Sequence, residues 1–268
     1  MKFAHLHERA GRAIVTLAAM SLTGLLGLPL LALILSAFEA DLLTQMVSPS
    51  VGAAIRLSLI TTLIGTVLIV LTGTPLAYLL ARRKFRGRSA IDALLELPIV
   101  LPPAVAGIAL LMAFGRRGLL GSVLTALNIS LPFTTAAVVL AQVFVAAPFY
   151  VRAAKVGFAS VSRELEEMAM SMGASGWQTF RLVTLPLARR AIVSGLALAW
   201  ARALGEFGAT ILFAGNLTGR TQTMPLAIYT SLESDLGAAL AIAVLLVGVS
   251  LVLMLLLRLV TREDTSEH

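Results

Sequence analysis

The sequence predicts an all-α membrane protein with six transmembrane helices. Of its 268 residues, 58% are hydrophobic and only 13% are charged, whereas a globular domain is about 45–50% apolar and about 25% charged. Because too few charged residues remain to cover a water-exposed surface, most of the chain must lie in lipid. A helix needs about 20 apolar residues to cross the hydrocarbon core, and six runs reach about this length: 13–38, 53–80, 91–114, 134–156, 192–213 and 236–259.

The first two runs are predicted to be complete spans. Lys2, Arg9 and Arg12 precede the run 13–38, as basic residues precede the core of a signal peptide. The run is longer than the core of about 7–15 residues in a signal peptide, and no small-residue cleavage site follows it. We therefore interpret it as a retained helix. The run 53–80 is long enough to tilt or to extend beyond the membrane.

The third run is interrupted by prolines. It contains Pro98, Pro102 and Pro103, and each proline removes a donor from the helical hydrogen-bond ladder. Irregular backbone at membrane depth is tolerated where it is packed in protein or lines a water-filled cavity. Two interpretations stay open for this run: part of a translocation path, or a kink at the start of a helix.

The fifth run carries charges where lipid is expected. Arg202, Glu206 and Thr210 recur every four residues, so a continuous helix would place them on one face. Charges inside a membrane are costly and usually face a cavity or a partner. Arg202 and Glu206 are predicted either to form a structural ion pair or, together with Thr210, to line a path for an anion. The runs 134–156 and 236–259 are predicted as spans from their length and apolar content.

The distribution of basic residues predicts the orientation. Lysine and arginine are enriched in the short cytoplasmic loops of membrane proteins. With the N-terminus inside, sixteen of the 21 lysines and arginines fall in cytoplasmic segments, and Arg56 and Arg202 fall within spans. The outer loops carry three: Arg116, Arg117 and Arg220. We therefore expect a multi-pass protein with both termini in the cytoplasm and with the polar segment 157–190 on the cytoplasmic side.

Several functional classes lack the residues that they need. The chain has no cysteine, and its three histidines lie near its two ends, so no metal site or catalytic cluster is expected and the protein is not expected to be an enzyme. No lysine follows a glycine, as a P-loop requires, so this chain is expected to bind no ATP or other cofactor. The net charge of +7 comes from loops between apolar runs, which indicates lipid and not nucleic acid as the partner. No internal repeat is visible, so residues 1–268 are predicted to form a single transmembrane domain.

The segment 157–190 carries a spaced motif. Its residues are Glu167, Met168, Ala169, Gly173, Val183, Leu185 and Pro186. The motif resembles the cytoplasmic coupling signature of ABC-transporter permeases, E-A-A-x3-G-x9-I-x-L-P, with Met168 in place of an alanine and Val183 in place of isoleucine. The resemblance implies that a short helix near 162–172 docks into a groove of a separate ABC ATPase subunit, which uses the ATP. Gly173 would let the chain turn at the helix end, and Pro186 would restart the next helix near its first turn.

Further stretches resemble one family of these permeases. The stretches 101–103, 114–118, 201–210 and 214–229 are similar to molybdate and tungstate ABC-transporter permeases, and the resemblance covers most of the chain. It implies the type I ABC importer permease architecture in the inner (cytoplasmic) membrane. It also implies a homodimer formed with a second copy of this chain, two ATPase subunits, a periplasmic oxyanion-binding protein, and alternating access driven by ATP.

Two other functions stay open. The stretch Gly-Glu-Phe-Gly-Ala at 205–209 is shared with sulfate/thiosulfate permeases, and sulfate, molybdate and tungstate are all tetrahedral dianions. A sulfate/thiosulfate ABC permease is therefore the alternative, although the stretches 114–118 and 221–229 favour molybdate. An ion-gradient-driven anion transporter is a further alternative. Such a transporter would need no coupling segment and would more often contain internal repeats.

Overall fold

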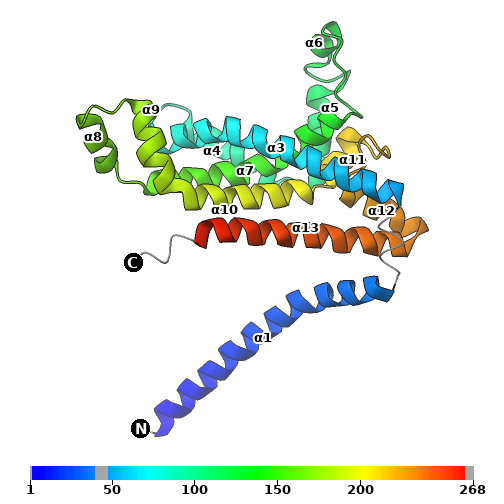
Figure 1. The fold of residues 1–268 in the computed structure, drawn as a ribbon, viewed down its shortest axis with the longest axis horizontal. Helices are drawn as coiled ribbons and strands as arrows, with labels where there is room; N and C mark the ends of the chain where they lie inside the picture. The colour runs from blue at the N-terminus through cyan, green and yellow to red at the C-terminus, as the bar shows by residue number, and fades with distance from the viewer. Residues whose placement is uncertain (1, 40–47, 263–268) are drawn as a thin grey trace.

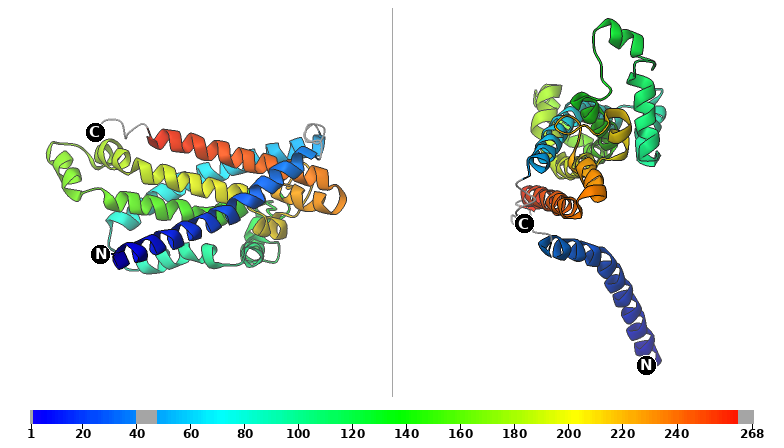
Figure 2. Two further views of the ribbon diagram at one scale, coloured as in Figure 1. Left: turned by 90° about the horizontal axis from the view of Figure 1, so that it is seen from below. Right: turned by 90° about the vertical axis from the view of Figure 1, so that its right-hand side faces the viewer.

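The computed structural model describes residues 2–39 and 48–262, and every regular element in this part of the chain is a helix (Figure 1). The elements are α1 (Lys2–Glu39), α3 (Pro49–Arg82), α4 (Arg88–Val100), α5 (Pro103–Phe114), α6 (Gly121–Ala126), α7 (Thr135–Ser160), α8 (Arg163–Ser171), α9 (Gly176–Thr179), the π-helix η1 (Phe180–Thr184), α10 (Leu185–Leu204), α11 (Gly208–Ala214), α12 (Met224–Ser234) and α13 (Leu236–Arg262). The helices α3, α7, α10 and α13 run along one bundle, with α8 and α9 at one end and α11 and α12 at the other (Figures 1 and 2).

Five helical segments are long and apolar enough to cross a membrane: Ile14–Ala37 within α1, all of α3, all of α7, Gly176–Leu204, and Leu236–Leu256 within α13. The first, second, fourth and sixth predicted spans each correspond to one of these segments. The helix α3 has 34 residues and is therefore about 51 Å long. It exceeds the hydrocarbon core of about 30 Å, as expected for a tilted or extended span. The predicted all-α class is confirmed.

The third predicted span consists of two helices. Between α4 and α5, Leu101 has φ −65° and ψ 133°, which is extended backbone. Pro102 and Pro103 follow it. The residue before a proline is driven towards extended angles, and the two prolines cannot donate to the ladder. With 13 and 12 residues, neither α4 nor α5 is long enough to cross the core by itself.

The fifth predicted span begins and ends earlier than expected. A continuous helical path covers Gly176–Leu204 through α9, η1 and α10, and α11 follows as a separate helix of seven residues. The expectation that Arg202, Glu206 and Thr210 share one helical face is therefore wrong. They lie in α10, in the break and in α11 respectively. The helix breaks where the Glu206 carboxylate receives the N–H of Ala209, because such side-chain bonds compete with the helical ladder.

The helices α3, α7 and α10 pack around one apolar core. Its largest fully buried side chains include Ile69, Leu80, Tyr150 and Phe158. The hydroxyl of Tyr150 lies 2.6 Å from the hydroxyl of Thr74, so this buried polar group is satisfied. The helices α7 and α10 approach closely at Gly157 and Gly195, where an added Cβ would lie 2.6 Å from the Cβ of Ala191 and of Ala153 respectively. Small residues allow membrane helices to approach in this way, and the three helices form a tightly packed frame.

A second core joins α5, α7 and α11 at the other end of the bundle, and it brings the two helix breaks together. Its members include Ala106, Leu110, Val138, Ala209 and Phe213. An added Cβ at Gly208, after the α10 break, would lie 2.5 Å from the Cβ of Pro103, after the α4 break. The two breaks therefore pack against each other on one side, whereas Val100, Pro102 and Pro103 of the first break stay exposed on the other. Irregular backbone at membrane depth needs cover from protein or water, so the exposed side calls for a further partner or a water-filled cavity.

The helix α1 lies apart from the bundle over most of its length (Figure 2). Most of its large apolar side chains from Ile14 to Leu35 are about half exposed or more, so lipid or another protein must cover them. The first residue of the chain and residues 263–268 lie outside the described part, and the cytoplasmic location of both termini stays a prediction.

Candidate coupling and pathway sites

The segment expected to meet an ATPase folds as the short helix α8 at its predicted position. Ser162 caps this helix by accepting a hydrogen bond from the N–H of Glu164 at 3.2 Å. The carboxylates of Glu164 and Glu166 in the first turn suit the positive end of the helix dipole. Gly173 follows the helix with φ +92°, a left-handed conformation that glycine adopts without strain. The predicted short helix and the turn at Gly173 are confirmed.

A buried carboxylate fixes α8 to the bundle. The Arg82 Nη2 group donates to Glu166 Oε1 at 2.8 Å and to the Val161 carbonyl at 3.1 Å. The Thr184 hydroxyl donates to the same Glu166 oxygen at 2.5 Å. The side chains of Arg82 and Glu166 are each only 10% exposed, and buried charges are tolerated when they are paired and hydrogen-bonded in this way. One side chain of α8 is thus bonded to the end of α3 and to the last residue before α10.

Sequence reasoning missed this contact. The motif singles out Glu167, which the structure leaves exposed, whereas the neighbouring Glu166 is buried. Arg82 lies 84 residues from Glu166 along the chain, and Thr184 lies 18 residues from it, so no local spacing links the three side chains. The sequence does place Arg82 at the end of a span, but the positive-inside rule already explains an arginine there.

The helix after α8 begins beside Ser175 and not at Pro186. Ser175 starts it with a reciprocal capping box, and the π turn η1 follows. A proline has no N–H and clashes with the carbonyl four residues earlier, and the wider π turn accommodates it. Pro186 lies in the first turn of α10, as expected, but α10 continues the helical path of α9 and η1 without a break. The interruption between helices is also shorter than 157–190, since α7 continues to Ser160.

The exposed surface of α8 and α9 carries apolar side chains as well as an acidic one. Met168 is 61% exposed, Met172 is 87% exposed and Trp177 is 67% exposed, and Glu167 is exposed beside them. Methionine adapts to irregular surfaces and is common at binding faces. Within the motif, the partly buried residues are Ala169, Val183 and Leu185, and the exposed ones are Glu167, Met168, Gly173 and Pro186. The exposed set is available to a partner.

The second candidate site is the ion pair between α10 and the break that follows it. Arg202 Nη1 lies 2.7 Å from Glu206 Oε2, and the two charges pair as predicted. Glu206 is 1% exposed, and its other oxygen accepts a hydrogen bond from the Ala209 N–H at 2.7 Å. Thr210 is fully buried, and its hydroxyl has no hydrogen-bond partner among the described residues. Of the three side chains, Arg202 is the most accessible, with 30% of its side chain exposed.

The chain matches a protein family over residues 73–263, and the family is described as the inner membrane component of binding-protein-dependent transport systems. This chain belongs to that family. It is 47% identical over 208 residues to the molybdenum transport system permease protein ModB of Mycobacterium tuberculosis. The aligned region covers 78% of this chain and 79% of the relative. A permease of this family is the membrane component of a transporter and not an enzyme.

Two further relatives define the range of similarity. The chain is 45% identical over 212 residues to the probable transport system permease protein NifC of Clostridium pasteurianum, covering 78% of this chain and 74% of the relative. It is 36% identical over 231 residues to the sulfate transport system permease protein CysT of Escherichia coli K12, covering 85% and 83%.

The fold is that of an ABC importer permease. The structure superposes on a chain of a bacterial ABC transporter involved in the import of the acidic polysaccharide alginate, seen in its crystal structure, with a TM-score of 0.76 and 17% identity. The match covers 99% of this chain and 100% of that chain. The arrangement of helices is thus shared although the sequences have diverged widely.

We predict opposite outcomes for two adjacent glutamates. Glu166→Ala leaves the Arg82 guanidinium buried without its counter-charge, and breaking a buried ion pair in this way costs about 3–5 kcal/mol. The purified permease should therefore unfold at a clearly lower temperature. The same substitution at the exposed Glu167 should change stability by no more than about 0.5 kcal/mol. Thermal unfolding of both variants beside the unmodified protein makes the comparison, and equal stability of all three would contradict the role of Glu166.

Proposed function

We propose that this chain is the permease subunit of an ATP-driven importer of molybdate. The observation that carries the proposal is its 47% identity over 208 residues to a molybdenum transport permease. The sulfate permease of Escherichia coli is less similar, at 36% identity. Tungstate is a tetrahedral dianion like molybdate, and we expect it to use the same route.

The partners follow from the family. A binding-protein-dependent system needs a periplasmic protein that delivers the oxyanion and an ATPase that supplies the energy. In the proposed complex, Met168, Met172 and Glu167 on α8 enter a groove of the ATPase, and Glu166 passes the movement of α8 to the bundle. A second copy of this chain completes the pore. The apolar surface that α1 leaves open supports a lipid environment and such a neighbour.

In this proposal the chain crosses the membrane six times in the type I importer architecture. The helices α4 and α5 together provide the third crossing. The N-terminal end of α1 and the C-terminal end of α13 lie at the same end of the molecule as α8 (Figures 1 and 2). This supports a cytoplasmic location for both termini, because α8 must be cytoplasmic to meet an ATPase.

A sulfate permease is the second candidate. It is favoured by the 36% identity to the sulfate permease, which extends over 85% of this chain. A pore that has to release its cargo need not bind it tightly, so the binding protein is expected to make most of the selection between the dianions.

We predict ATP-dependent uptake of molybdate by the reconstituted complex. The permease, its ATPase and a molybdate-binding protein are placed in proteoliposomes, and uptake of radiolabelled molybdate is measured with ATP or with a non-hydrolysable analogue. Excess tungstate should suppress the uptake, whereas the same excess of sulfate should not. No uptake with the molybdate-binding protein, together with ATP-dependent uptake of sulfate when a sulfate-binding protein replaces it, would assign the sulfate function instead. Uptake without ATP would favour an ion-gradient transporter.

We predict that α8 faces the cytoplasm. The native chain has no cysteine, so single cysteines report their own location. A membrane-impermeant thiol reagent added to intact cells should label Thr218→Cys and should not label Ser89→Cys or Ser175→Cys until the membrane is opened. Labelling of Ser89→Cys or Ser175→Cys from outside would reverse the orientation.

We propose that Arg202, Glu206 and Thr210 lie along the path of the oxyanion, with Arg202 presenting its charge. The double variant Arg202→Met with Glu206→Gln removes both charges but keeps an amide oxygen that can accept the Ala209 N–H. Because a buried ion pair can be replaced by neutral groups at little cost, the variant should fold and assemble. Uptake should nevertheless fall at least about tenfold. Full uptake by an assembled double variant would leave the pair with a structural role alone.

A further inference from the structure

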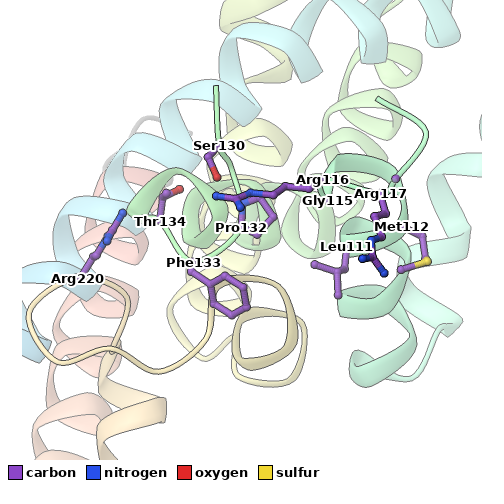
Figure 3. Close-up of a pocket in the computed structure, with 11 residues that line it drawn as sticks. Leu111, Met112, Gly115, Arg116, Arg117, Ser130, Pro132, Phe133, Thr134 and Arg220 are labelled. Atoms are coloured by element: carbon purple, nitrogen blue, oxygen red, sulfur yellow. The ribbon is translucent and has the colours of Figure 1, made fainter. Parts of the chain in front are cut away.

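Three arginines from two separate loops of the chain share one cleft. Arg116 and Arg117 follow α5, and Arg220 lies between α11 and α12. All three line a cleft of about 690 Å³. Figure 3 shows Arg116 in the middle of the cleft, with Arg220 on one side and Arg117 on the other. The fold therefore gathers, in one place, all three basic residues that the sequence assigns to the outer loops.

The charge of this cleft is unusual for its position. Basic residues are normally depleted outside the membrane, yet the three exceptions converge. No acidic residue lines the cleft. Among the side chains that the structure describes, the ion pairs involve other arginines and lysines. A group of positive charges in a cleft lined by no acidic residue attracts an anionic partner.

The backbone on both sides of the cleft is held in place. The Leu119 N–H donates to the Met112 carbonyl at 2.9 Å, so the turn that carries Arg116 folds back onto α5. On the other side, the Thr135 hydroxyl donates to the Arg220 carbonyl at 2.9 Å, which ties that loop to the start of α7. The arginine side chains remain exposed. They extend from fixed positions and are free to pair with a visiting group.

The size and lining of the cleft indicate the class of ligand. Its volume of about 690 Å³ corresponds to roughly twenty water molecules at about 30 Å³ each, which is far more than a tetrahedral oxyanion fills. Met112, Pro132 and Phe133 add apolar surface, and Phe133 is 53% exposed. Guanidinium groups bind carboxylates in a two-pronged geometry, while the apolar side chains can cover neighbouring residues of the same ligand. This combination suits an acidic segment of a protein.

We propose that this cleft docks an acidic segment of the periplasmic binding protein. The inference rests on the proposed function and on the predicted orientation, which places the α5–α6 turn on the outer side of the membrane. The family depends on a binding protein, and a periplasmic binding protein would reach the permease from that side. Exposed arginines that face carboxylates of the binding protein would accelerate the encounter of the two proteins and fix their relative position. The binding protein would then open directly over the pore.

The test measures the affinity of the ligand-loaded binding protein for the complete permease–ATPase complex in lipid nanodiscs. Arg116→Glu, Arg117→Glu and Arg220→Glu are compared with Arg56→Glu, which alters an exposed arginine near the outer end of α3 that does not line the cleft. We expect each cleft variant to bind about tenfold more weakly at low salt and to lose part of the salt dependence. The control should change affinity less than about twofold. All four complexes should keep the basal ATPase rate, which shows that they are assembled.

The outcomes separate the cleft from the proposed function. Unchanged affinity in the three cleft variants would overturn the inference. A second outcome would also overturn it. If the cleft variants dock normally but their complexes, tested without binding protein, no longer bind radiolabelled molybdate, the ligand of the cleft is the free dianion. Molybdate-binding and sulfate-binding proteins are tested in parallel. If the unmodified complex binds only the sulfate-binding protein, the molybdate assignment fails, and weaker docking of that protein to the cleft variants still supports the cleft.

Discussion

The buried carboxylate of Glu166 is the contact on which the proposed coupling end depends. The helix α8 has only nine residues, and a helix of this length is not stable in water by itself. Its position therefore comes from tertiary contacts. Arg82 and Thr184 bind the carboxylate, and the Arg163 Nη2 group donates to the Arg82 carbonyl at 3.1 Å. These bonds hold α8 in a fixed position relative to α3 and the start of α10, although α8 projects from the bundle.

The second constraint is lipid, which forces irregular backbone to find protein partners. The chain breaks its helices at 101–102 and at 205–207, both within predicted spans. The fold places these breaks against each other, so close that Gly208 has no room for a side chain beside Pro103. The contact protects each break on one side only, because Pro102 and Pro103 remain exposed. Whether the prolines of the third span line a path or only bend the helix stays open.

Much of the fold could be predicted because its causes are local. Apolar length decides which segments span the membrane, Ser162 and Gly173 mark the two ends of α8, and the spacing of Arg202 and Glu206 permits their pairing. The features that could not be predicted depend on distant residues. Glu166 is buried because α3 brings Arg82 to it.

The same dependence on contacts outside the local sequence explains why both the start and the end of the fifth predicted span are wrong. The path through Pro186 stays helical because a π turn precedes it, and that turn presents Thr184 to a carboxylate 18 residues away. Helix α10 ends because Glu206 binds the next turn of the chain. In both cases a side-chain contact, and not the propensity of the local sequence, decides where the helix begins or stops.

The helix α7 connects the two ends at which partners are proposed to act. Its 26 residues extend about 39 Å. At its first turn Thr135 holds the loop of Arg220. Towards its other end Lys155 Nζ lies 2.6 Å from Asp92 Oδ1 of α4, and the carbonyl of Val161, the residue after the helix, accepts a hydrogen bond from Arg82. Close packing along α10 leaves α7 little room to bend. In the proposed importer, a force on α8 would therefore move the bundle and its outer cleft as one body. The pore would open by displacement of one copy against the other, and not by rearrangement within a single chain.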